Sequence, residues 1–158
     1  MERNLRRFAK DMDLAIRQYG SNKVSWAKDV SWIHVKDFQL PDNFRQSRTD
    51  ILILVPDNYG YGGCYRDNFI ETDLELLDRD GHSYRMLSSD IHGFREYPYS
   101  SMSESMKKIL RDRGWFYLCL HDKNPESSLV NYLYKVRLYL GNPYKDWKAI
   151  EQYGKGGR

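Results

Sequence analysis

A run of five apolar residues, Ile-Leu-Ile-Leu-Val at positions 51–55, constrains the fold of this chain more than any other segment. The run is short, apolar throughout and rich in branched side chains, and turn-forming residues follow it at once. These features are typical of a β-strand that is covered on both faces. We therefore predict a central strand here.

Segments on both sides of this run have strand patterns. Residues 31–40 alternate apolar and polar side chains with one slip, and residues 69–77 alternate again. Asp80 and Gly81 form a turn signal that joins the second segment to residues 83–87 as a hairpin. Strands that follow one another directly predict an antiparallel meander of three to four strands.

Three other segments have the apolar spacing of helices. The first, residues 3–19, ends at Gly20, and the second, residues 100–113, is short. The last is predicted to begin at Asn124 as its N-cap and to end at Gly141. The stripe of the first helix consists of Leu5, Phe8, Met12, Ala15, Ile16 and Tyr19. The order of elements predicts an α+β fold with an N-terminal helix, a meander sheet and C-terminal helices.

Composition narrows the class of protein. The chain has 158 residues, of which 41% are hydrophobic and 15% aromatic, which suits one folded domain over residues 1–150. Residues 151–158 should be a flexible tail. No apolar run approaches the ~20 residues that span a bilayer, and the charged start does not resemble a leader, so we expect a cytoplasmic protein without a membrane partner. The net charge of +3 comes from interleaved signs and argues against a nucleic-acid partner.

The two cysteines, Cys64 and Cys119, have no spacing to each other or to histidine that suggests a metal site, and we expect free thiols and no cofactor. Cys119 lies in an apolar segment, where a cysteine is usually a small core residue. Cys64 lies next to the glycine-rich segment 56–63, which predicts a long exposed loop. That loop could hold a partner or could simply be flexible.

Three stretches together resemble the ubiquitin-conjugating (E2) superfamily, and more closely the bacterial E2-like proteins of ubiquitin-like conjugation operons. They are residues 40–44 with 50–59, which are similar to the family's strand and its Pro-x-x-Tyr turn, then residues 117–121 and residues 128–143. Tyr-Leu-Cys-Leu-His at 117–121 is similar to the stretch that holds the E2 nucleophile. The helix that follows and its Asn-Pro end are similar as well.

The resemblance implies a UBC-like fold and an acyltransferase that carries a ubiquitin-like modifier as a thioester on Cys119. Its partners would be the modifier, an E1-like adenylating enzyme and a target protein, and its context would be bacterial defence against phage. The stretch also suggests roles for two neighbours of the nucleophile. His121 shares a strand face with Cys119 if the segment is extended, and Asp122 is the candidate for aligning or deprotonating the acceptor amine.

The sequence departs from the E2 pattern in the oxyanion motif. The family's His-Pro-Asn tripeptide is absent, and residues 108–112 stand in its place. Asn124 is a candidate donor to the oxyanion, although helix capping competes for its side chain.

Other interpretations stay open at this stage. An E2-variant binding module would have the same fold with Cys119 in the core, and Cys64 is the rival nucleophile. Gly156-Gly157 before Arg158 is also typical of a modifier terminus. A basic face formed by Arg3, Arg6, Arg7 and Lys10 on the first helix is either solvated or a contact for the E1-like enzyme.

Overall fold

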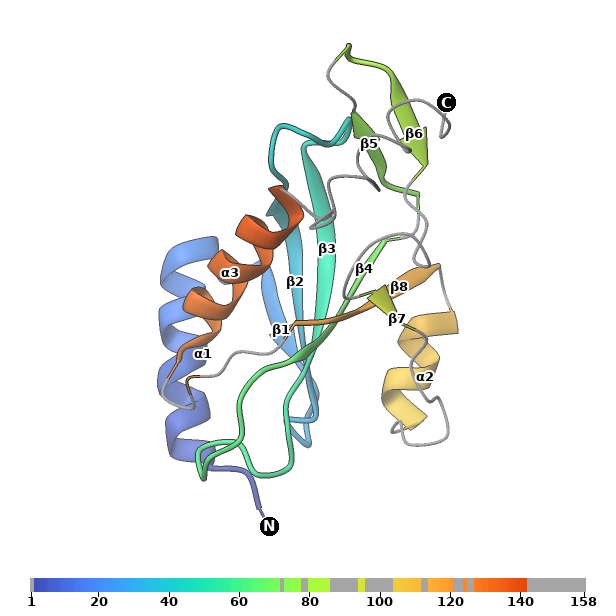
Figure 1. Ribbon diagram of the computed structural model, residues 1–158. Helices are drawn as coiled ribbons and strands as arrows, with labels where there is room; N and C mark the ends of the chain where they lie inside the picture. The colour runs from blue at the N-terminus through green and yellow to red at the C-terminus, as the bar shows by residue number, and fades with distance from the viewer. Residues whose placement is uncertain are drawn as a thin grey trace.

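The computed structural model describes residues 2–71, 73–77, 80–85, 94–95, 104–111, 114–120, 124 and 127–141. Its helices are α1 (Leu5–Tyr19), α2 (Glu104–Arg111) and α3 (Leu129–Gly141). Its strands are β1 (Val24–Trp26), β2 (Trp32–Gln39), β3 (Arg48–Leu54), β4 (Asp67–Glu71), β5 (Glu75–Leu77), β6 (Ser83–Arg85), β7 (Phe94–Arg95) and β8 (Trp115–Cys119). The predicted α+β class is confirmed (Figure 1).

The main sheet has the strand order β1-β2-β3-β4-β8-β7, and every described pairing in it is antiparallel. Its first four strands follow chain order, as a meander does. The sheet is nevertheless wider than expected, because β8 pairs with β4 and β7 pairs with β8. The predicted strand 69–77 is divided between β4 and β5, and β5 forms a separate hairpin with β6 across the expected Asp80-Gly81 turn.

The expectation for residues 51–55 is confirmed. β3 lies between β2 and β4, and the side chains of Ile51, Leu52 and Ile53 are fully buried. Ile51 and Ile53 join one apolar cluster, whereas Leu52 joins a second cluster on the other side of the sheet. The 51–53 part of the strand therefore has no polar side chain, because both of its faces are covered there.

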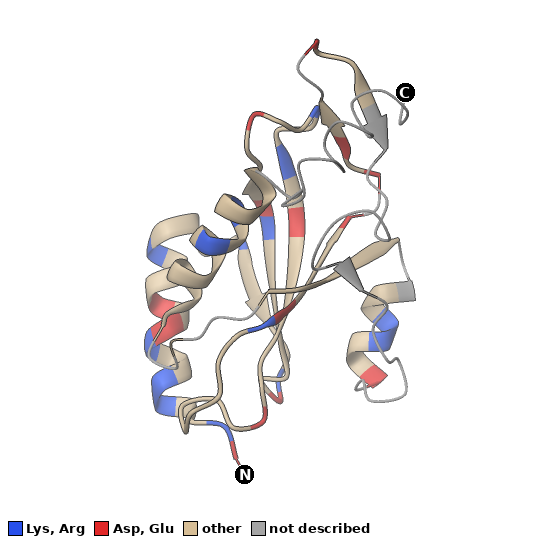
Figure 2. Cartoon of the chain, viewed as in Figure 1, with Lys and Arg blue, Asp and Glu red and all other residues tan. Residues whose placement is uncertain are grey.

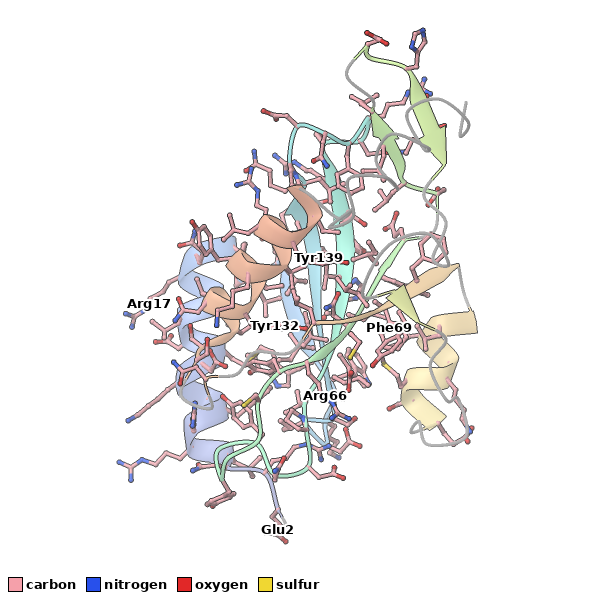
Figure 3. All side chains as sticks on the ribbon, viewed as in Figure 1. Glu2, Arg17, Arg66, Phe69, Tyr132 and Tyr139 are labelled. Atoms are coloured by element: carbon pink, nitrogen blue, oxygen red, sulfur yellow. The ribbon has the colours of Figure 1, made fainter. Side chains whose placement is uncertain are left out.

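Two layers cover the sheet (Figure 1). Helices α1 and α3 pack on one face, where residues such as Phe8, Ile53 and Leu133 form the larger core. We call this the α1/α3 face. Helix α2 packs on the opposite, α2 face, where Met106 meets Leu52 and Phe69. The two faces can be followed in Figure 3, where Tyr132 lies on the side of α3 and Phe69 on the side of α2.

The slip in the alternation of residues 31–40 is a β-bulge. The register of β2 against β3 shifts between Val35 and Phe38, and Asp37 has a φ of 52°. Two polar contacts hold Asp37 there: its backbone N–H donates to Oδ1 of Asp50 at 3.2 Å, and its carboxylate pairs with Lys23. The extra residue returns Phe38 to the core face, as a bulge of this kind does.

Asp11 lies inside the apolar stripe of α1 and is buried. Its Oδ2 accepts hydrogen bonds from the hydroxyls of Tyr59 (3.0 Å) and Tyr65 (2.6 Å). Its Oδ1 accepts the backbone N–H of Leu129 at 2.7 Å, at the start of α3. One carboxylate thus joins α1, the β3–β4 connection and α3, and the three donors offset the cost of burying its charge.

The glycine-rich segment 56–63 is packed against α1, so the expectation of a long exposed loop is wrong for part of it. Tyr59 is buried, and its carbonyl accepts the N–H of Asn4 at 2.9 Å. Asn4 is also the N-cap of α1, with Oδ1 accepting the N–H of Arg7. Gly60 has a φ of 85°, and a Cβ at this position would lie 2.3 Å from Cβ of Asn4. The glycine here serves close packing.

The basic residues at the start of α1 differ in their surroundings. Arg3 donates to the carbonyl of Val55 and pairs with Asp57 at 2.7 Å, and the guanidinium of Arg7 lies 5.5 Å from the ring centroid of Tyr59. Arg6 and Lys10 are exposed. In Figure 2 basic and acidic residues both occur along α1, whereas α2 has an acidic residue at its start and basic residues after it. In the described part of the chain, none of the helices has the length and apolarity needed to cross a membrane.

Candidate functional site

Cys119 is the last residue of β8 and is half-buried. In the antiparallel register it lies directly opposite Asp67, the first residue of β4. Alternation along β8 places Leu118 in the large core of the α1/α3 face, and Tyr117 packs in the cluster of the α2 face. Cys119 is therefore on the α2 face with Tyr117, because residues two apart on a strand point to the same side.

Asp67 is the centre of a polar cluster that we name the Cys119 cluster, formed by Arg66, Asp67, Tyr117 and Cys119. The carboxylate of Asp67 is buried, with the residue 8% exposed. Oδ2 accepts a hydrogen bond from Nε of Arg66 at 3.1 Å, and Oδ1 accepts one from the hydroxyl of Tyr117. Arg66, labelled in Figure 3, keeps most of its side chain in solvent.

The backbone fixes these groups relative to one another. Residues 67–71 of β4 pair with residues 119–115 of β8 in antiparallel register. Just beyond this pairing, the N–H of Leu120 donates to the carbonyl of Arg66 at 2.7 Å. The strands are thus hydrogen-bonded on both sides of the Cys119–Asp67 pair. Opposed Cβ atoms in such ladders lie roughly 4.5–5.5 Å apart, so the thiol and the carboxylate are close neighbours.

The electrostatics agree with this arrangement. Burial, first of all, raises the pKa of Tyr117, and its hydrogen bonds with Asp67 and Cys119 raise it further. The hydrogen bond with Asp67 is the main cause of a raised pKa for Arg66, and Cys119 contributes a smaller attraction. The phenol therefore keeps its proton at neutral pH, and the guanidinium pairs with the carboxylate and adds a weaker attraction toward the thiol.

The other predicted site residues are placed as follows. His121 and Asp122 lie outside the described residues, so their proposed roles stay predictions. Asn124 is exposed, and its carbonyl accepts the N–H of Ser127 in a turn. It is not the N-cap of the last helix, because α3 begins at Leu129 and Oγ of Ser128 accepts the N–H of Asn131 at 3.2 Å.

Cys64, the rival nucleophile, lies in the β3–β4 connection and is half-buried like Cys119. Its sulfur is 3.8 Å from the carbonyl oxygen of Gly62, a local contact within the loop. Neither cysteine is in a disulfide. The two thiols thus differ in their described surroundings. The contact described for Cys64 is local, whereas Cys119 has a carboxylate, a phenol and a guanidinium as neighbours.

Sequence reasoning missed Arg66, Asp67 and Tyr117. Part of the signal was present, because alternation places Tyr117 on the same face as Cys119. The pairing of Asp67 with Cys119 joins residues that are far apart in the chain, and the sequence carries no register for that pair. Among the described residues there is no group of three or more His, Cys, Asp or Glu that could hold a metal ion.

The chain was compared with protein-family models, with curated proteins and with solved structures, and none of them matched. The chemistry of the Cys119 cluster and the sequence around it are therefore the basis for assigning a function. The cluster brings a half-buried thiol, a proton-bearing phenol, a carboxylate and a cation to one end of the β4–β8 pair. The surroundings of this thiol are therefore polar and charged, unlike those of a cysteine packed only among apolar side chains.

Proposed function

We propose that this protein is an E2-like acyl carrier, with a UBC-like fold, that takes a ubiquitin-like modifier from an E1-like enzyme as a thioester on Cys119. One observation carries the proposal: the Cys119 thiol stands half-buried beside Arg66, Asp67 and Tyr117, not sealed in an apolar core. A reactive cysteine needs partial exposure and a nearby cation, and both are present. The resemblance of residues 117–121 to the E2 nucleophile stretch supports a ubiquitin-like modifier as the acyl group.

The chemistry consists of two acyl transfers. In the first, the thiolate of Cys119 attacks the carbonyl carbon of the modifier's C-terminal glycine, which is held as a thioester on the E1-like enzyme. The new S–C bond forms and the E1 sulfur leaves as a thiolate. In the second, an amine of the target attacks the same carbon, a C–N bond forms, Cys119 leaves as a thiolate and the amine loses a proton to a base.

Two neighbours of the nucleophile complete the proposed site. Asp122 is the base that receives the proton of the acceptor amine, and His121 lies two residues from the sulfur, where it supports the thiolate. We further propose that the protein acts in the cytoplasm of a bacterium as part of an antiphage conjugation system. The order of the elements supports the E2-like assignment, since α1 and the meander come first and the helix α3 follows the cysteine.

The test is a charging assay with the cognate E1-like and ubiquitin-like proteins and ATP, read on non-reducing gels. We expect the wild type to form an adduct that a thiol reagent removes. Cys119→Ser should give either no adduct or an oxyester that resists thiol and yields to alkali. Cys64→Ser is the matched control, because it removes the other half-buried sulfur and should charge like the wild type.

Two results would contradict the proposal. Loss of the adduct in Cys64→Ser alone would move the nucleophile to the β3–β4 connection. Absence of any adduct, while the E1-like enzyme itself becomes charged with the modifier, would make the protein a non-catalytic E2-variant binding module.

A further inference from the structure

The hydroxyl of Tyr117 has two acceptors near it, the carboxylate of Asp67 and the sulfur of Cys119. It donates to Oδ1 of Asp67, and it also interacts with Cys119. Because Asp67 is the cross-strand partner of Cys119, a tyrosine that reaches this carboxylate must extend along the strand toward the sulfur. The placement of the hydroxyl next to the thiol thus follows from the register as well as from the contact.

The ring of Tyr117 is held in this direction by packing. It lies 5.4 Å from the ring of Phe69, centroid to centroid, in the apolar cluster of the α2 face. Phe69 is buried, two residues beyond Asp67 on the same side of β4. A ring fixed at one end by Phe69 and at the other by Asp67 presents its hydroxyl in one place, which is the requirement for a preorganised donor.

We propose that Tyr117 is a positioning residue for the nucleophile: its hydroxyl, held beside the sulfur by Asp67, donates a hydrogen bond to Cys119 once the thiol has lost its proton. The inference rests on the proposed function, which makes the thiolate the attacking species. No role of this kind was expected for Tyr117 from the sequence.

The charges around the sulfur decide how such a donor acts. Asp67 faces Cys119 from β4 and disfavours a second negative charge, whereas Arg66, just before β4, favours it. Helix α2 contributes Met106, Ile109 and Leu110 to the apolar cluster on the same face. The hydroxyl of Tyr117 can turn its hydrogen bond from the carboxylate to the thiolate. This bond stabilises the ionised sulfur, whereas the charge of Asp67 opposes its ionisation.

The hydroxyl of Tyr117 has a single proton and two acceptors beside it, so its hydrogen bond responds to the state of the sulfur. When Cys119 is a thiolate, Tyr117 donates to it. When the sulfur is acylated it carries no charge and is a poor acceptor, so Tyr117 returns its hydrogen bond to Asp67.

The experiment measures the alkylation rate of Cys119 by iodoacetamide from pH 6 to pH 10, followed by mass spectrometry. Every protein carries Cys64→Ser, so that one thiol reports. Tyr117→Phe should raise the pH of half-maximal rate by about one unit and slow the reaction about tenfold at pH 7, since a charge-assisted hydrogen bond is lost. Asp67→Asn should shift the profile to lower pH, because it removes a neighbouring negative charge and leaves Tyr117 to the thiolate.

Tyr134→Phe is the matched control, because Tyr134 is 62% exposed on α3 and the same oxygen atom is removed. Adding Tyr117→Phe to Asp67→Asn should raise the half-maximal pH again. The proposal is overturned if Tyr117→Phe and Tyr134→Phe give the same profile, or if Tyr117→Phe has no effect in the Asp67→Asn background. Alkylation needs no modifier, so this result stands apart from the charging assay.

Discussion

The hydroxyl of Tyr65 donates a 2.6 Å hydrogen bond to Oδ2 of Asp11, in a core where both side chains are almost fully buried. Tyr59 donates to the same oxygen, and the N–H of Leu129 donates to the other. The site offers three donors to the two carboxylate oxygens, which suits a carboxylate better than an amide side chain. The stability of the fold should therefore depend on this one acidic side chain.

Replacing Asp11 with Asn tests that dependence. The amide nitrogen is a donor and would face either the tyrosine hydroxyls or the N–H of Leu129, so we expect a loss of about 2–4 kcal/mol in the free energy of unfolding. Urea denaturation followed by tryptophan fluorescence measures it. Asp13→Asn is the control: Asp13 forms an exposed ion pair with Arg17, and its loss should cost less than ~0.5 kcal/mol. An Asp11→Asn variant as stable as the control would contradict the expectation.

The same site predicts how stability changes at alkaline pH. Burial raises the pKa of Tyr65 and of Tyr59, and the negative charge of Asp11 raises both further. In the unfolded chain these phenols ionise near pH 10, whereas in the folded protein they stay protonated. The unfolded state thus loses protons first, and stability should be complete below about pH 10 and fall as the pH rises above it.

Urea denaturation of the wild type and Tyr65→Phe between pH 8 and pH 11 checks this dependence. The variant lacks one hydroxyl that titrates, so its stability should decline less steeply above pH 10, by on the order of 1 kcal/mol per pH unit. Tyr61→Phe is the comparison, because Tyr61 is exposed and should leave the slope unchanged. Parallel slopes for all three proteins would argue against a folded state that holds the phenol proton of Tyr65.

Substitutions at Gly60 and Gly62 distinguish the cost of backbone strain from the cost of a steric clash. Both have positive φ, 85° and 96°, but a Cβ on Gly60 would meet Asn4 at 2.3 Å, whereas a Cβ on Gly62 meets nothing within 4 Å. Gly62→Ala should show only the backbone strain, and Gly60→Ala should cost a further 1–3 kcal/mol or so from the forced shift of the α1 N-cap. Thermal unfolding of the two variants gives the difference, and equal melting temperatures would show that the contact relaxes freely.

Phe69 tests the core on the α2 face. Truncation to Ala removes the whole of a buried ring that packs with Leu52, Met106 and Tyr117, and should cost about 3–5 kcal/mol. Denaturant unfolding is the measurement, with the exposed Tyr134→Ala as the control, which should cost far less. A small cost for Phe69→Ala would mean that α2 closes over the gap.

Local patterns in the sequence predicted much of the fold. The apolar run at 51–55 identified the central strand because a strand buried on both faces needs consecutive apolar residues, and this pattern can be read from the segment alone. The slip before Phe38 was visible for the same reason, since a bulge shifts the alternation itself. The helix from Leu5 to Tyr19 also followed its stripe, although Leu5 is exposed at the first turn.

Contacts between distant segments were not predictable in this way. Nothing in the sequence placed Asp11 in the core, and only the approach of Tyr59, Tyr65 and Leu129 makes its burial favourable. The candidate site shows the same limit. Cys119 was found from its own neighbours in sequence, while Asp67 belongs to the site only through the register of β4 with β8.

The position of β8 inside the sheet also matters while the protein is being made. β8 occupies the edge of β4, yet its residues are synthesised well after Glu71, the end of β4. At roughly 5–20 residues per second, translation leaves that edge of the growing sheet without β8 for several seconds. During this interval the nascent chain presents open N–H and C=O groups to other chains. Chaperone binding that shields this edge would matter most at this stage of synthesis, and slower elongation would lengthen the exposure.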